Sequence, residues 1–164
     1  MIWKEGISFP SFVYKELALK KLLLLIFLLH GGITFAQLQK PVKWSYSAKK
    51  INKQEAEVYL KATIQNGWHI YAMQVSGGPI PTSFHFSSSK SYRLIGKTLE
   101  PKPLIKYDKV LKKNLAFFEN EVVFKQRIKL LRPKVVVSGL LEFMVCSDKS
   151  CLPAEEVAFK IPVS

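Results

Sequence analysis

Cys146 and Cys151 are the residues of this sequence with the most distinctive chemistry, and they are its only cysteines. Four residues separate them in the stretch FMVCSDKSCLPAEEVAF. A thiol pair this close along the chain could form a structural disulfide, contribute to a metal site, or exchange disulfides with another protein. The surrounding sequence bears differently on each of these three hypotheses.

A purely structural disulfide would be weakly placed here. Closing so small a ring removes little conformational entropy from the unfolded chain, about 2 kcal/mol against nearly 5 kcal/mol for a loop of about 100 residues. Small domains that depend on disulfides usually carry several, which join distant segments. The structural hypothesis nevertheless stays open.

A zinc site would need further ligands, and His69 and His85 are the candidates outside the leader. Both histidines precede the cysteines and lie 16 residues apart, and His85 falls on the polar face of its predicted strand, between Phe84 and Phe86. This arrangement does not favour a two-Cys, two-His zinc site. We therefore assign no metal ligand and no cofactor.

In redox exchange, one thiolate attacks the disulfide of a partner and the second thiol resolves the mixed disulfide. Two neighbouring cysteines are the minimum that this reaction requires. Lys149, between the two cysteines, would favour a thiolate, whereas the neighbouring Asp148 would oppose one. The local charges therefore do not decide how reactive the pair is.

The N-terminal residues predict export. Lys20 and Lys21 precede the apolar run LLLLIFLL and the small-residue ending TFA, which is the order of a secretory signal peptide. We predict a signal peptide over residues 1–36 and a single domain over residues 37–164. An uncleaved anchor is the alternative, but residues 22–36 fall short of the roughly 20 apolar residues that a spanning helix needs. We expect no stable membrane insertion after cleavage.

The chain is strongly basic, with 25 Lys and Arg against 12 Asp and Glu and a net charge of +13. Its lysines are spread along the sequence instead of being concentrated on one predicted element. This distribution, together with the predicted export, argues against nucleic-acid binding and favours a solvated basic surface.

Period-2 alternation predicts an all-β, immunoglobulin-like β-sandwich of about seven strands. In AEVYLKATI and VVFKQRIKL, alternate residues are apolar, and VKWSYS, TSFHFS and EEVAFKI behave alike. KVVVSGLLEFMV is more continuously apolar, which predicts a central strand covered on both faces. Turns are predicted at QNG, SGGPIP and LRPK, and a long loop over residues 100–114.

An ordered set of motifs resembles the N-terminal periplasmic domain of the DsbD thiol:disulfide interchange proteins. The set comprises VKWSYSAKKI, NGWHIYAMQ, PIPTSFHF, YRLIGKTLEP, YDKVLKKNLAFFENEVVFKQRIKL and the ending F-x-V-C-x4-C-x-P. It spans nearly all of residues 40–162. The resemblance implies an immunoglobulin-like fold whose cysteine pair passes electrons from a membrane reductase to periplasmic clients.

The resemblance also implies roles for individual residues. Cys151 would form mixed disulfides with partners, and Cys146 would resolve them. A cap loop that shields the cysteines would correspond to residues 107–114, and the other residues at the rim of the site would be aromatic. The rim residues implied in this way are Tyr107, Asp108 and Leu111 of the cap loop and Trp68, His69 and Tyr71 of GWHIY.

Three features depart from the family pattern. Leu111 stands where an aromatic cap residue is expected, which would loosen the shielding of the cysteines. Ala154 follows Pro153 where a second proline is common. The sequence ends at Ser164 without a membrane portion or a thioredoxin-like domain, so we expect a separate transmembrane thiol:disulfide reductase as the electron donor.

The leading hypothesis is therefore periplasmic thiol:disulfide exchange through Cys146 and Cys151, as a component of a protein-disulfide reductase system. The clients implied by the resemblance are disulfide isomerases, cytochrome c-maturation thioredoxins and similar thioredoxin-like proteins. The alternative is a non-catalytic secreted binding module of the same fold, in which the disulfide is structural.

Overall fold

The computed structural model describes residues 20–21, 40–75, 77–108 and 112–164. The chain divides into two units, residues 1–39 and residues 40–164. The predicted signal peptide lies outside the described residues except for Lys20 and Lys21. Among the residues that are described, none forms a helix with the length and hydropathy of a membrane span.

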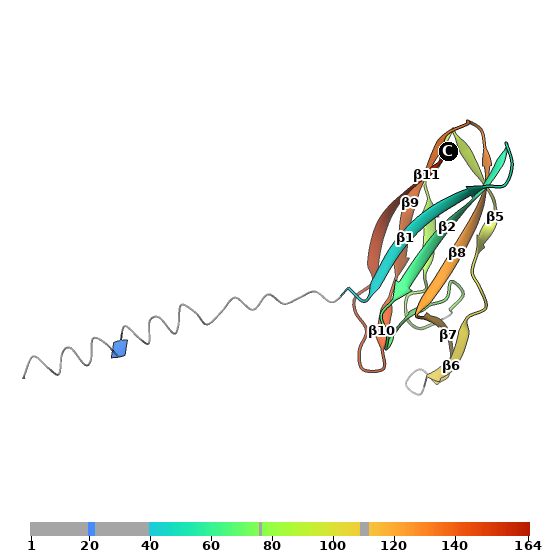
Figure 1. Ribbon diagram of the computed structural model, residues 1–164. Coiled ribbons are helices and arrows are strands. Elements are labelled where there is room, and N and C mark those ends of the chain that lie inside the picture. Colours follow the sequence, from blue (N-terminus) through green and yellow to red (C-terminus); the bar gives the residue numbers. More distant parts are fainter. Residues whose placement is uncertain (1–19, 22–39, 76, 109–111) are drawn as a thin grey trace, which may run out of the picture. The chain divides into compact units, whose positions relative to one another are not determined.

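The second unit is built from strands (Figure 1). Within the described residues they are β1 (Val42–Lys50), β2 (Glu55–Ile64), β3 (Trp68–Tyr71), β4 (Ser83–Phe86), β5 (Tyr92–Leu99), β6 (Leu104–Asp108), β7 (Lys113–Glu119), β8 (Glu121–Leu130), β9 (Val135–Phe143), β10 (Val145–Ser147) and β11 (Glu155–Val163).

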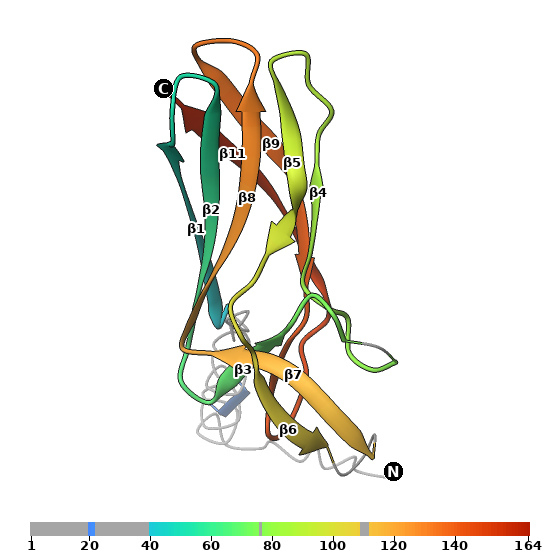
Figure 2. The same ribbon diagram turned by 90° about the vertical axis from the view of Figure 1, so that its right-hand side faces the viewer.

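These strands form three antiparallel sheets. One has the order β1-β2-β8-β5, the second has the order β11-β9-β4, and the smaller strands form a third with the order β10-β3-β7-β6. The first two sheets pack face to face, which confirms the predicted all-β, immunoglobulin-like sandwich. The third sheet, called the end sheet below, lies at one end of this sandwich (Figure 2).

The predicted alternation is confirmed in the central strands of the first sheet. In β2 and β8, every second side chain is buried, and the residues between them face outward. Gln126 occupies an inward position of β8 and is only 1% exposed. Its amide nitrogen donates to the carbonyl oxygens of Ile95 and Arg127 at 3.1 and 2.8 Å, and its oxygen accepts from the Thr98 hydroxyl at 2.9 Å. These hydrogen bonds offset the cost of burying a polar side chain.

Two sequence predictions were wrong. β9 is a central strand, but only one of its faces is covered, because Val136 and Leu140 are 55% and 39% exposed. The segment 100–114, predicted as a long loop, contains all of β6 and the start of β7. Alternation is hard to recognise there because both faces of β6 carry exposed residues, which include Leu104, Ile105 and Tyr107.

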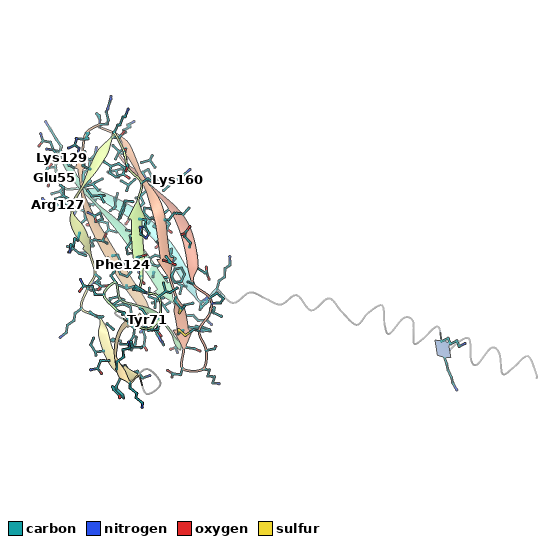
Figure 3. All side chains as sticks on the ribbon, turned by 180° about the vertical axis from the view of Figure 1, so that it is seen from behind. Glu55, Tyr71, Phe124, Arg127, Lys129 and Lys160 are labelled. Carbon is teal, nitrogen blue, oxygen red and sulfur yellow. A yellow bond between two sulfur atoms is a disulfide. The ribbon has the colours of Figure 1, made fainter. Side chains whose placement is uncertain are left out.

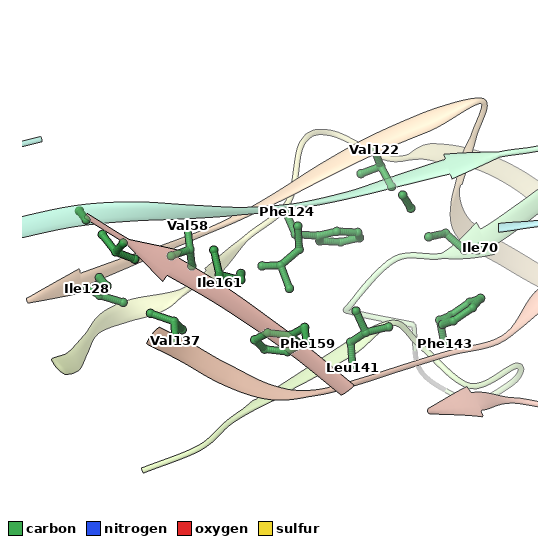
Figure 4. Packing of buried hydrophobic residues seen from close by; sticks show 14 of the residues in the cluster. Val58, Ile70, Val122, Phe124, Ile128, Val137, Leu141, Phe143, Phe159 and Ile161 are labelled. Atoms are coloured by element: carbon green, nitrogen blue, oxygen red, sulfur yellow. The ribbon is translucent and has the colours of Figure 1, made fainter. Parts of the chain in front are cut away.

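Buried side chains from all three sheets meet at the centre of the domain, among them Phe124 of β8, Leu141 of β9 and Ile70 of β3 (Figure 4). The ring of Phe124 in β8 lies 4.9 Å from Phe84 in β4 and 6.0 Å from Trp44 in β1, measured between centroids. It also meets Phe118 of the end sheet edge to face at 5.8 Å. Such aromatic pairs contribute about 0.5–1.5 kcal/mol each beyond the area they bury.

Two strands of the end sheet continue directly into strands of the two larger sheets. β7 runs into β8 of the first sheet through a single residue, Asn120, whose φ of 60° is one that asparagine tolerates better than most side chains. β9 runs into β10 through a single residue, Met144. The end sheet is therefore fixed to the sandwich through the covalent continuity of two strands as well as through Phe118.

Gly139 of β9 provides a test of the packing between strands. A methyl group at this position would lie 2.3 Å from the backbone oxygen of His85 and 2.7 Å from the Phe159 ring. We therefore expect Gly139→Ala to lower the free energy of unfolding by about 1–3 kcal/mol in urea denaturation. Ser138→Ala, at the neighbouring outward-facing position, is the control and should change it by less than about 0.5 kcal/mol. Equal stability of the two variants would contradict this packing.

Candidate functional site

Cys146 and Cys151 form a disulfide across a tight hairpin. The amide of Ser147 donates to the carbonyl oxygen of Ser150 at 2.8 Å, and the amide of Leu152 donates to that of Val145 at 3.0 Å. The cysteines therefore occupy the non-hydrogen-bonded pair between these two bonds, where opposite residues approach most closely. Their Cα atoms are 4.0 Å apart.

Ser147 holds the turn between the cysteines. Its hydroxyl oxygen accepts from the amides of Lys149 and Ser150, both at 3.2 Å, and its hydroxyl lies 3.1 Å from the carbonyl oxygen of Ser150, to which it donates. Serine commonly stabilises turns through such local bonds. The sequence SDKS thus has a structural role, which is to bring Cys151 back beside Cys146.

The two cysteines differ in solvent exposure. Cys146 is 1% exposed and belongs to a small apolar cluster with Tyr71, Leu115 and Phe117. Cys151 is exposed, because it lies beyond the turn. A thiolate from another protein can therefore approach Cys151 but not Cys146.

Strand register places further side chains beside the disulfide. Cys146 of β10 pairs with His69 of β3, and His69 pairs with Glu119 of β7. Residues paired in this way lie on the same face of a sheet, with Cβ atoms about 4.5–5.5 Å apart. Tyr71 is two residues beyond His69, so Tyr71 and its partner Phe117 share this face.

This face of the end sheet forms a pocket of about 290 Å³. Figure 3 shows Tyr71 near the disulfide, at the end of the domain away from Lys129 and Arg127. The residues that line the pocket are His69, Tyr71, Lys106, Tyr107, Leu115, Phe117, Glu119, Cys146, Ser147, Asp148 and Cys151. The structure therefore brings together five of the residues predicted from sequence, namely both cysteines, His69, Tyr71 and Tyr107.

The other predicted rim residues are placed differently. Trp68 pairs with Ser147 in the strand register, but its side chain packs against the main core, away from the pocket. Asp108 ends β6, where its backbone pairs with that of Lys113. Leu111 lies outside the described residues.

Sequence reasoning missed six lining residues: Ser147 and Asp148 in the turn between the cysteines, and Lys106, Leu115, Phe117 and Glu119 on β6 and β7. Three of them alternate in KNLAFFE, where Leu115, Phe117 and Glu119 share one face of β7. That alternation was the available signal. It was hidden because Phe118, between two of them, is also apolar and faces the main core.

His69 is the titratable residue at the centre of this face. Its Nε2 lies 3.2 Å from the Tyr71 hydroxyl, and its ring centroid is 5.0 Å from that of Phe117. Burial lowers the pKa of His69 below its usual value, while the charges of Glu119 and Asp148 act to raise this pKa and that of Lys106 to lower it. Burial is the largest of these effects, so the neutral imidazole is favoured at neutral pH.

Lys106 and Asp148 form an ion pair across the mouth of the pocket, with 3.3 Å between Nζ and Oδ1. Their side chains are 66% and 85% exposed. An ion pair this exposed contributes little to stability, about 0–1 kcal/mol. It does, however, connect β6 to the turn between the cysteines.

The zinc hypothesis has no geometric support. His85 lies on β4 of a different sheet and is exposed, whereas His69 is beside the disulfide. Within the described part of the chain, no cluster of three or more His, Cys, Asp or Glu residues could hold a metal ion.

Comparison with known proteins agrees with this geometry. The sequence profile of the family described as "Thiol:disulfide interchange protein DsbD, N-terminal" matches residues 36–162. The chain belongs to this family. The resemblance stated from the sequence motifs is thereby confirmed, and the cysteine pair belongs to a domain family of thiol:disulfide interchange proteins.

Solved structures with low sequence identity share the fold. The N-terminal periplasmic domain of ScsB from Proteus mirabilis aligns with a TM-score of 0.57 at 16% identity, over 79% of this chain and 49% of that one. A structure of the complex between the DsbD and PilB N-terminal domains from Neisseria meningitidis aligns with a TM-score of 0.50 at 12% identity, over 76% of this chain and 87% of that one. The reduced DsbD N-terminal domain from the same organism aligns with a TM-score of 0.48 at 13% identity, over 71% of this chain and 82% of that one. No curated protein sequence matches the chain.

The difference in exposure predicts an order of modification. When the reduced domain is treated with limiting iodoacetamide, Cys151 should be alkylated first and Cys146 much more slowly, because only Cys151 is accessible. Peptide mass spectrometry at successive times measures both rates. The same reaction in denaturant is the control and should remove the difference. Equal rates in the folded domain would contradict the assigned burial.

Proposed function

We propose that this domain relays reducing equivalents by thiol:disulfide exchange, with Cys151 as the thiol that meets partners and Cys146 as the thiol that resolves the mixed disulfide. The observation that carries the proposal is the contrast between a buried and an exposed cysteine within one disulfide at the edge of an open pocket. A disulfide that served only stability would not need one sulfur to be accessible. Membership of the DsbD N-terminal family supports the same reaction.

The exchange proceeds in two steps in the direction of client reduction. The Cys151 thiolate attacks one sulfur of the client's disulfide, so that a mixed disulfide forms and a client thiolate leaves. Cys146, as a thiolate, then attacks the Cys151 sulfur, and the second client sulfur leaves. Two electrons pass to the client, which takes up two protons, and the domain returns to its disulfide form.

The domain needs a donor that reduces this disulfide and a client that reoxidises the dithiol. We propose a separate transmembrane thiol:disulfide reductase as the donor and thioredoxin-like or disulfide isomerase proteins as clients. Support for a protein client comes from the solved complex in which a DsbD N-terminal domain is bound to the PilB N-terminal domain. The open pocket beside Cys151 leaves room for a partner's cysteine loop.

We place this reaction in the periplasm, after removal of the signal peptide proposed for residues 1–36. Support comes from the leader sequence and from the ScsB domain of similar fold, which is described as periplasmic. A compartment that contains oxidised proteins is also where a thiol reductant has substrates.

The roles of the two cysteines can be separated by single substitutions. Reduced Cys146→Ser, mixed with an oxidised thioredoxin-like protein, should accumulate a mixed disulfide through Cys151, because the domain has no second thiol to resolve it. Reduced Cys151→Ser should accumulate little, because Cys146 is buried. Non-reducing electrophoresis and peptide mapping measure both products, and the variant with both substitutions is the control.

Equal trapping by the two single variants would contradict the assigned roles. Absence of trapping by either variant would favour the alternative of a non-catalytic binding module with a structural disulfide.

A further inference from the structure

One row of side chains crosses the end sheet beneath the disulfide. It consists of Cys146 on β10, His69 on β3 and Glu119 on β7, in consecutive register pairs on one face. The register therefore places His69 directly between Cys146 and Glu119, with the Cβ atoms of neighbouring residues about 4.5–5.5 Å apart. The three residues thus stand in the order of a thiol nucleophile, a base that accepts its proton, and an acidic residue that stabilises the protonated base.

The attack of Cys146 on the mixed disulfide requires a base that accepts the proton of its thiol. Only the thiolate of Cys146 can attack, so its thiol must first lose a proton. Cys146 is 1% exposed and packed among Tyr71, Leu115 and Phe117, so water has little access to this proton. Two of these three neighbours are hydrocarbon side chains that cannot accept it, and the third, Tyr71, is a phenol.

The groups facing His69 come from every neighbouring element. Glu119 lies on β7, Asp148 follows β10, Lys106 lies on β6, and Tyr71 lies on β3 itself. The two carboxylates favour the imidazolium, and the ammonium group of Lys106 opposes it. Because burial lowers the pKa of His69, the ring is available as a proton acceptor at neutral pH.

We propose that His69 accepts the proton of the Cys146 thiol during resolution of the mixed disulfide, and that the carboxylate of Glu119 favours the imidazolium so formed. The inference rests on the exchange function proposed above and assigns a further residue to it. The Cys146 S–H bond breaks, its proton moves to the imidazole, and the sulfur attacks Cys151 while the partner's thiolate leaves. The imidazolium then loses its proton to solvent; when a donor reduces the domain, His69 takes up a proton from solvent and passes it to Cys146 as that sulfur leaves as a thiolate.

Reaction of the reduced domain with 5,5′-dithiobis(2-nitrobenzoate) separates the two steps. Attack by Cys151 releases one coloured thionitrobenzoate, and attack by Cys146 on the resulting mixed disulfide releases the second. In stopped-flow measurements at neutral pH, we expect His69→Gln to slow the second release on the order of 100-fold, the lower end for loss of general acid–base catalysis. The first release should be unchanged.

His85→Gln is the matched control, because His85 is exposed on β4 of another sheet. This variant should leave both releases unchanged. Far-UV circular dichroism reports whether each variant is folded, because an exposed Cys151 would also react in a misfolded domain.

The pH profile distinguishes proton transfer from a packing role. In the wild-type domain the rate of the second release should rise with pH as His69 loses its proton and then level off, whereas in His69→Gln this inflection should disappear. Glu119→Gln should move the inflection to lower pH, because removing a neighbouring negative charge lowers the pKa of His69.

An unchanged second release in His69→Gln would overturn the role of His69 alone. Equal slowing of both releases, or an inflection that persists without His69, would also overturn it in favour of a packing role. If the wild-type domain showed no first release, the exchange function and this inference would both fail.

Discussion

The packing of Phe124 against aromatic rings from all three sheets is the interaction on which the rest of this structure depends. Its contact with Phe84 joins the two sheets of the sandwich, its contact with Trp44 lies within the first sheet, and its contact with Phe118 joins the end sheet to them. Phe117, the neighbour of Phe118, faces the opposite way and lines the pocket. A single pair of adjacent phenylalanines thus fixes the end sheet to the core and forms part of the site.

The chemical difference between the cysteines follows from this arrangement. Cys146 lies on β10, which continues β9, and its side chain is covered by those of Tyr71, Leu115 and Phe117. Cys151 lies beyond a turn held by Ser147 and is exposed. The two cysteines therefore differ in accessibility because of their positions in one hairpin. An exchange reaction with one attacking and one resolving cysteine requires such a difference.

The sequence was sufficient to predict the sandwich and the position of the cysteine pair at the end of a strand. Alternation in β2 and β8 is regular because one face of each strand is buried and the other is solvated. The end sheet was not predicted, because the chain changes sheets at single residues, Asn120 and Met144, without a recognisable turn sequence. The row that contains Glu119 depends on strand register between distant segments, which local periodicity does not specify. The roles of Tyr107, His69 and Tyr71 as rim residues came from family resemblance and not from periodicity.

The central claim is that this disulfide is made to be opened and re-formed. The most direct test is the reduction potential of the Cys146–Cys151 pair, measured in the folded domain by equilibration with glutathione or dithiothreitol buffers. The account predicts a potential clearly less negative than about −300 mV, with the domain still folded in its reduced form. A potential below about −300 mV would contradict it and identify the bond as structural.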